Sequence, residues 1–285
     1  MQPKLVLIEG LPGFGKTTTA QLVHDILIDM NINTQLFLEG NLDHPADYDG
    51  VACFGEYEYQ ELLRDHAEFS DLLRTHLMKQ GNHYFLAYRK LLNEDGVSIP
   101  QELINNIFKY DIYELPLAQN RERITEKWEQ FAKHSMNGTD TYIFDCCFIQ
   151  NPVTIGMIKY GAANEVVMSY VKQLASIVEQ LNPLLLYVEQ DDLDHSFRRA
   201  VKERPAAWSE GFIEYYTSQG FGLDHGYHGL EGTLQVLKAR RELEETIYND
   251  LSIAKEKVNN SSYDVDVYKQ RLVKILAAHF SENMS

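Results

Sequence analysis

The chain has 285 residues, 44% hydrophobic and 24% charged, which fits one large globular domain or two ordinary ones and excludes a disordered chain. Its 42 acidic and 26 basic residues leave a net charge of −16, which disfavours nucleic acid and anionic membranes as partners. Three cysteines are too few for a disulfide framework, and no apolar run has the length of a membrane span. These features predict a cytoplasmic protein that binds neither nucleic acid nor membranes.

The first predicted element is a buried strand over residues 4–9, which leads through a glycine-rich loop into an amphipathic helix. The loop, Gly10-Leu-Pro-Gly-Phe-Gly-Lys-Thr17, matches the phosphate-binding pattern in which backbone N–H groups and a helix N-terminus surround phosphate oxygens. We expect Lys16 to reach the outer phosphates of ATP and the Thr17 hydroxyl to coordinate Mg²⁺. The predicted nucleotide-binding residues are Gly10, Gly13, Phe14, Gly15, Lys16, Thr17 and Thr18.

Four further apolar runs predict strands that alternate with helical patterns. They cover residues 34–38, 142–144, 183–189 and, more weakly, 253–258. This alternation predicts an α/β three-layer sandwich with a mostly parallel five-stranded sheet, as in phosphate-loop NTPases, forming a single domain over residues 1–285.

Two carboxylates stand at the carboxyl ends of predicted strands, where ligands bind in a doubly wound sheet. Glu39 follows the second strand. We expect it to be the general base that contacts the molecule receiving a phosphoryl group, called the acceptor below, and takes its proton. Asp145 ends the third strand, and we expect it to act on the magnesium side, with the role of base left open between the two. The alternatives are that Glu39 begins a polar loop and that Asp145 caps the next turn.

A stretch of about ninety residues separates the second and third strands and is too long for an ordinary crossover connection. Its patterns predict a helical insertion over residues 54–136. Arg64 and Arg74 in this insertion, together with Asn41 just before it, are candidate acceptor-binding residues. The alternative for each arginine is a solvated charge on a helix face.

The segment after the fourth strand covers residues 191–230 and begins with a predicted helix. It contains the cations Arg198, Arg199, Lys202 and Arg204, and Pro205 ends its first helix. Five glycines within residues 220–232 suggest mobility. The nearby Asp224, His225 and His228 lack further ligand-type residues, so a structural or lid role is favoured over a metal site.

The loop spelled Gly-x-x-Gly-x-Gly-Lys-Thr and the order of the following features resemble the phosphate-loop kinases of the nucleoside and nucleotide kinase type, with thymidylate kinases as the nearest familiar relatives. The resemblance spans most of the chain. It implies that the insertion over residues 54–136 binds the phosphoryl acceptor and that residues 191–230 form a lid, whose cations Arg198, Arg199 and Arg204 close over the transferred phosphoryl group. Thymidylate kinases usually have an arginine after the position of Asp145, whereas Cys146 and Cys147 follow it here. A thymidylate acceptor is therefore disfavoured.

The leading hypothesis is a phosphotransferase that uses ATP and Mg²⁺ and moves the γ-phosphoryl group to a hydroxyl or phosphate of a small molecule. A nucleotide-hydrolysing switch that controls a protein partner is the alternative, and phosphorylation of a polynucleotide conflicts with the net charge. The sequence leaves open which molecule is the acceptor, whether ATP or GTP is preferred, and whether the chain forms a homodimer.

Overall fold

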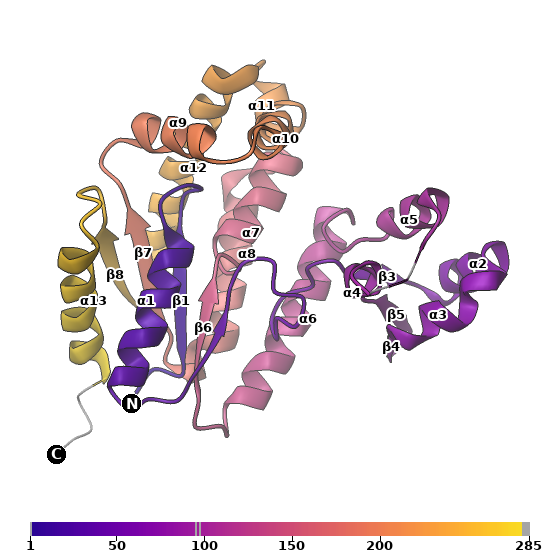
Figure 1. The fold of residues 1–285 in the computed structure, drawn as a ribbon, viewed down its shortest axis with the longest axis horizontal. Helices are drawn as coiled ribbons and strands as arrows, with labels where there is room; N and C mark the ends of the chain where they lie inside the picture. The colour runs from indigo at the N-terminus through magenta and orange to yellow at the C-terminus, as the bar shows by residue number, and fades with distance from the viewer. Residues whose placement is uncertain (1, 95, 97, 281–285) are drawn as a thin grey trace. The chain divides into compact units, whose positions relative to one another are not determined.

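The computed structural model describes residues 2–94, 96 and 98–280, and Figure 1 draws their fold. The chain forms two compact units. The first, called the sheet unit, contains the described residues up to Glu39 and those from Trp128 onward. The second, called the inserted unit, is Gly40–Lys127.

The sheet unit is built on a five-stranded sheet in which every pairing is parallel. The strand order is β2-β6-β1-β7-β8, so β1 is central. The predicted parallel α/β sheet is confirmed. Its strands are β1 (Leu5–Gly10), β2 (Thr34–Phe37), β6 (Thr141–Asp145), β7 (Leu184–Glu189) and β8 (Ala254–Asn259).

Helices flank the sheet on both faces. The connection from β1 to β2 and the connection from β6 to β7 run in opposite directions across the sheet. Because such crossovers are right-handed, the two connections lie on opposite faces. Accordingly α1 (Lys16–Asp29) packs against α13 (Val265–Phe280), and α8 (Asn164–Val178) packs against α12 (Gly229–Asp250) (Figure 1).

The segment predicted to be a lid is helical. It contains α9 (Leu193–Glu203), α10 (Ala206–Thr217) and α11 (Gly220–Asp224) before α12 begins. Mobility was the predicted reason for the glycines here, but Gly222 has another one. It is buried, and a Cβ atom at this position would lie 2.0 Å from the Tyr216 carbonyl oxygen. This glycine permits close packing of backbone on backbone. The remaining elements of the sheet unit are α7 (Gln150–Val153), the π-helical turn η2 (Thr154–Lys159) and η3 (Glu179–Leu181).

The inserted unit differs from the all-helical prediction because it holds a three-stranded antiparallel sheet of order β3-β5-β4. These strands are three or four residues long, too short for a period-2 pattern to stand out from the flanking helical patterns. They are β3 (Ala52–Phe54), β4 (Leu77–Gln80) and β5 (His83–Leu86); the helices are α2 (Glu56–Asp65), η1 (Ala67–Phe69), α3 (Ser70–Thr75), α4 (Tyr88–Leu92) and α5 (Gln101–Phe108), and α6 (Leu117–Ser135) leads back to the sheet unit.

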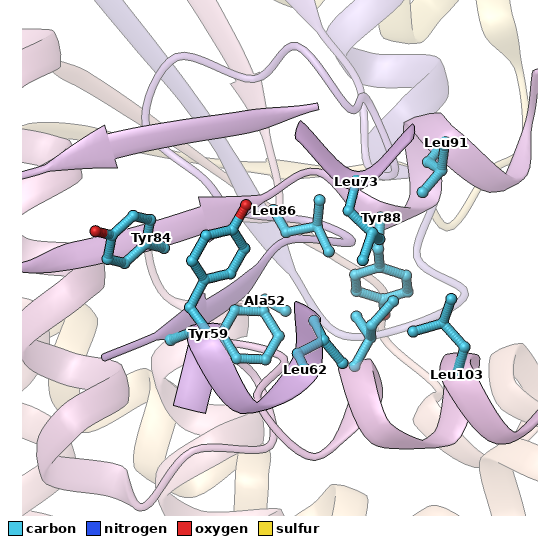
Figure 2. Packing of buried hydrophobic residues seen from close by; sticks show 11 residues of the cluster. Ala52, Tyr59, Leu62, Leu73, Tyr84, Leu86, Tyr88, Leu91 and Leu103 are labelled. Atoms are coloured by element: carbon cyan, nitrogen blue, oxygen red, sulfur yellow. The ribbon is translucent and has the colours of Figure 1, made fainter. Parts of the chain in front are cut away.

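The inserted unit has a hydrophobic core of its own, shown in Figure 2. Leucines from the helices surround Tyr88, and the rings of Tyr59 and Tyr84 stack with centroids 4.5 Å apart. An independent core explains why this long stretch between two strands of one sheet is an ordered unit rather than a loop.

Candidate functional site

The glycine-rich loop lies between β1 and α1, where the sequence predicted it. Gly10, Gly13 and Gly15 all have positive φ, at 143°, 85° and 89°. Gly15 occupies the N-cap position of α1 in the left-handed region, which other residues rarely adopt. No side chain caps this helix and its first turn holds no acidic residue, so the positive end of α1 is left to the loop.

Lys16 is the first residue of α1, and its side chain folds back under the loop. It is 6% exposed, and its Nζ donates to the Leu11 carbonyl oxygen at 3.1 Å. Burial opposes the charge, but Cys146, Glu39 and Asp145 outweigh it and raise the pKa of Lys16 above its usual value. The loop therefore holds a buried, fully protonated ammonium group.

Strand register brings the two predicted carboxylates together. Phe37 of β2 pairs with Phe144 of β6, so the residues just beyond these strands meet at one edge of the sheet. The Thr17 hydroxyl, on an exposed residue of α1, donates to Asp145 Oδ2 at 2.7 Å. Glu39 is also exposed, so a bound molecule can approach its carboxylate.

Cys146 links the two carboxylates. Its Sγ lies 2.8 Å from Asp145 Oδ1 and 3.6 Å from Glu39 Oε2. Its φ of 76° is a left-handed backbone conformation that residues other than glycine seldom adopt, and it turns the chain sharply at the end of β6. Burial raises the pKa of the Cys146 thiol well above its usual value, so the proton stays on sulfur and is available for a hydrogen bond to either carboxylate.

Gln150 and Glu9 belong to this site although the sequence did not single them out. The Gln150 side-chain amide donates from Nε2 to Glu39 Oε1 at 2.9 Å. The buried Glu9 carboxylate accepts the backbone N–H groups of Phe148 at 2.7 Å and Gln150 at 2.9 Å. Burial raises the pKa of Glu9 to about 7. Glu9 thus fixes the start of α7, which in turn places the amide of Gln150 on Glu39.

A buried ion pair lies on the helix after the lid. Arg240 Nε donates to Glu244 Oε1 at 2.6 Å, with side-chain exposures of 0% and 1%. Arg240 Nη1 also contacts Thr154 Oγ1 at 3.1 Å and the Tyr216 hydroxyl at 2.5 Å. Burial opposes the charge on Arg240, but Tyr216 and Glu244 outweigh it and raise its pKa.

The predicted lid cations lie on or just after α9, and the three arginines among them have partners within the sheet unit. Arg198 binds both carboxylate oxygens of Glu231, at 2.6 and 2.8 Å. Arg199 pairs with Glu203 at 2.7 Å and lies over the ring of Tyr263, and Arg204 lies over the ring of Trp208.

The remaining predicted nucleotide-binding residues also lie in the sheet unit. Phe14 is buried, and its carbonyl oxygen accepts from Asn260 Nδ2 at 2.7 Å. Asn260 directly follows β8, so this contact joins the loop to the carboxyl end of an edge strand of the sheet. Thr18 is exposed on the first turn of α1.

The predicted acceptor-binding residues of the inserted unit lie on its surface. Arg64 is 66% exposed and pairs with Glu61 and Asp65, and Arg74 is 57% exposed and pairs with Asp71. Their exposure and local ion pairs are those of solvated helix-face charges, and acceptor binding by either arginine stays a prediction. Asn41 accepts a hydrogen bond from the Asp43 backbone N–H at 2.8 Å within its own turn.

The histidine segment contains no assembled metal site. The ring of His225 stacks on Phe221 with centroids 4.0 Å apart, and its Nδ1 lies 2.8 Å from the Phe221 carbonyl oxygen. Across the described residues, no group of three or more His, Cys, Asp or Glu side chains is arranged to hold a metal ion. The structural role favoured for this segment agrees with these local contacts.

Comparison with known proteins does not identify the chain. No protein-family model matches it, and no characterised protein matches its sequence significantly. In the described part of the chain, every helix is too short or too polar to cross a membrane.

Proposed function

We propose that the protein is a phosphotransferase that binds ATP with Mg²⁺ and transfers the γ-phosphoryl group to a small-molecule acceptor. One observation carries the proposal: the Thr17 hydroxyl, next to the buried Lys16, hydrogen-bonds Asp145 at the carboxyl edge of the sheet. A glycine-rich loop with this lysine, hydroxyl and carboxylate is the arrangement that binds the phosphates of a nucleotide and its magnesium ion.

The donor groups suit Mg²⁺, which prefers hard oxygen ligands and often takes only one or two from the protein. The Thr17 hydroxyl and the Asp145 carboxylate, 2.7 Å apart, would hold it. When bound, the ion would neutralise charge on the phosphate oxygens.

The chain's own residues divide the remaining work. Lys16 supplies a positive charge to the outer phosphates, and the N–H groups of the loop bind their oxygens. Glu39 accepts the proton of the acceptor group, with its carboxylate oriented by Gln150. The lid cations Arg198 and Arg199 would exchange their present carboxylate partners for phosphate oxygens, a stronger class of charged hydrogen bond than exposed ion pairs.

The test is an acceptor screen with γ-labelled ATP and Mg²⁺, covering nucleosides, nucleoside monophosphates, aminoglycosides and phenicols. A labelled small product is expected. Lys16→Ala should lower its formation about a hundredfold while the chain still folds, because one charge contact to the phosphoryl group is lost. Undiminished turnover in this variant would contradict the proposal.

Glu39→Gln tests the base. It retains size and most hydrogen bonding but removes the proton acceptor, so transfer should fall by about two to four orders of magnitude with ATP affinity unchanged. Weakened nucleotide and metal binding together would place Glu39 on the magnesium side instead. Release of phosphate with no labelled small product would favour the nucleotide-hydrolysing switch.

A further inference from the structure

The side-chain amide of Gln150 has one satisfied end and one unsatisfied end. Because a carboxylate only accepts hydrogen bonds, Nε2 must be the atom that faces Glu39 Oε1, 2.9 Å away. The other amide atom, Oε1, is buried and has no hydrogen-bond partner. Gln150 is 8% exposed, so water has little access to it. A buried carbonyl oxygen without a partner is costly and requires a hydrogen-bond donor.

The two acceptor atoms lie close together. Oε1 of Gln150 is separated from Glu39 Oε1 by the 2.9 Å hydrogen bond and the width of one amide group, which places the two oxygens within roughly 5 Å. This spacing matches two donor groups on neighbouring or next-but-one carbon atoms of one molecule. A ligand whose second donor displaces the side chains that cover Gln150 Oε1 would therefore be held through two hydrogen bonds that it donates.

The electrostatics of this corner of the sheet disfavour a phosphate as the acceptor group. Glu39 and Asp145 are both carboxylates, and the Cys146 thiol is already directed at them. Lys16 is assigned to the phosphates of ATP, and Arg240, a second buried cation of the sheet unit, is paired with Glu244. A phosphate monoester would bring about two negative charges beside two carboxylates, whereas a neutral hydroxyl brings a proton donor.

From these contacts, and resting on the proposed function, we infer that the acceptor is an uncharged polyhydroxylated or amino-alcohol compound rather than a phosphate monoester. One hydroxyl donates its proton to Glu39 while its oxygen attacks the γ-phosphorus. The bond from that phosphorus to the bridging oxygen of ADP breaks, and ADP leaves with the electron pair. A second O–H or N–H group of the same molecule donates to Gln150 Oε1 and fixes which hydroxyl reacts.

Matched acceptors test the first half of this inference. The full chain is incubated with γ-labelled ATP, Mg²⁺ and one compound of each pair: cytidine or cytidine monophosphate, thymidine or thymidine monophosphate, glycerol or glycerol 3-phosphate. Kanamycin and chloramphenicol complete the panel as an amino-alcohol and a diol. Label is expected only in unphosphorylated compounds. Label in a monophosphate, giving a diphosphate, would overturn the inference and leave the proposed function intact, whereas no labelled compound would contradict both.

A variant tests the role of Gln150. For the best acceptor, an analogue whose neighbouring hydroxyl is O-methylated, or whose neighbouring amine is replaced by hydrogen, should react about ten- to a hundredfold less efficiently in kcat/KM, because Oε1 is left unpaired. Gln150→Met lacks both amide atoms at similar size, so it should raise KM for the acceptor and reduce this discrimination to about one. Any loss of kcat from a less oriented Glu39 affects both compounds and cancels in the ratio.

Gln35→Met is the matched control. Gln35 also donates from a side-chain amide to a carboxylate, Asp140 Oδ2 at 2.5 Å, but at the opposite end of β2 and on an exposed residue. It should keep the wild-type discrimination. Thermal unfolding of both variants checks that they are folded. A Gln150→Met enzyme that still discriminates between the two acceptors as the wild type does would exclude Gln150 as the second contact.

Discussion

Replacing Arg240 by methionine should destabilise the sheet unit strongly. The substitution removes the guanidinium group that pairs with Glu244 at 2.6 Å and leaves that carboxylate 1% exposed, with the Tyr187 hydroxyl at 2.7 Å as its remaining contact among those described here. Breaking one side of a buried ion pair costs about 3–5 kcal/mol, since the other charge loses its compensation without regaining water. That is a large fraction of the roughly 5–15 kcal/mol by which a domain is stable.

The double variant Arg240→Met/Glu244→Leu separates the charge from the lost packing. With no carboxylate left unpaired, it should recover about 2 kcal/mol or more of the loss, even though the hydroxyls of Tyr187 and Tyr216 lose partners. Urea unfolding followed by tryptophan fluorescence is the assay. Both tryptophans, Trp128 and Trp208, belong to the sheet unit, so the signal reports on the unit that contains the substitutions.

Two results would refute this reasoning. A single variant that loses less than about 1 kcal/mol would show that the pair is hydrated or replaceable in the folded chain. A double variant whose loss equals the sum of the two single losses would show that the two charges do not interact, despite the short contact between them.

Three further predictions concern the pH response, the packing and the lid. The pKa of Glu9 is about 7 in the folded chain, against 4.5 for an ordinary glutamate such as the unfolded chain presents. Between these two values only the unfolded chain releases the proton, so the free energy of unfolding should fall by about 3 kcal/mol as pH rises. Glu9→Gln should flatten that slope in urea unfolding measured across the range; an unchanged slope would assign it to other groups. Gly222→Ala should cost about 1–3 kcal/mol in the same assay, because its Cβ would meet the Tyr216 carbonyl oxygen, and a neutral effect would show that α11 shifts freely. Binding of an ATP analogue should increase hydrogen-exchange protection over residues 191–229, and equal protection with and without it would exclude the lid role.

Four strands of the sheet were predictable because each lies in a short, largely apolar run, and a glycine, carboxylate or turn marks where it ends. The fifth strand, β8, alternates charged residues with others and was therefore predicted only weakly. The same logic placed Glu39 and Asp145 at one edge, since parallel strands of one sheet end together. What the sequence did not contain was the register. Phe37 opposite Phe144 is the pairing that brings Cys146 within reach of Glu39, and no local pattern encodes it.

The buried polar residues were missed for a different reason. Arg240 and Glu244 are spaced as an ordinary exposed i,i+4 ion pair, the usual interpretation of such residues on a helix. The apolar residues around them could have indicated that the two charges are buried. Leu237, Arg240, Glu244 and Ile247 follow one another at the spacing of an apolar stripe, so the two charges stand on the buried face of α12.

The glycine-rich loop packs closely against α9, and this limits how α9 can move. A Cβ on Gly13 would lie 3.1 Å from the Cβ of Ala200 on α9. The helix is anchored at its start by the Asp192 side chain, which accepts the His195 backbone N–H, and ends before Pro205. A wide outward rotation of α9 would break this contact and expose the loop backbone. In the proposed phosphotransferase, nucleotide entry and product release would therefore proceed by a small shear of α9 across the loop, with the backbone changes confined to the two ends of the helix.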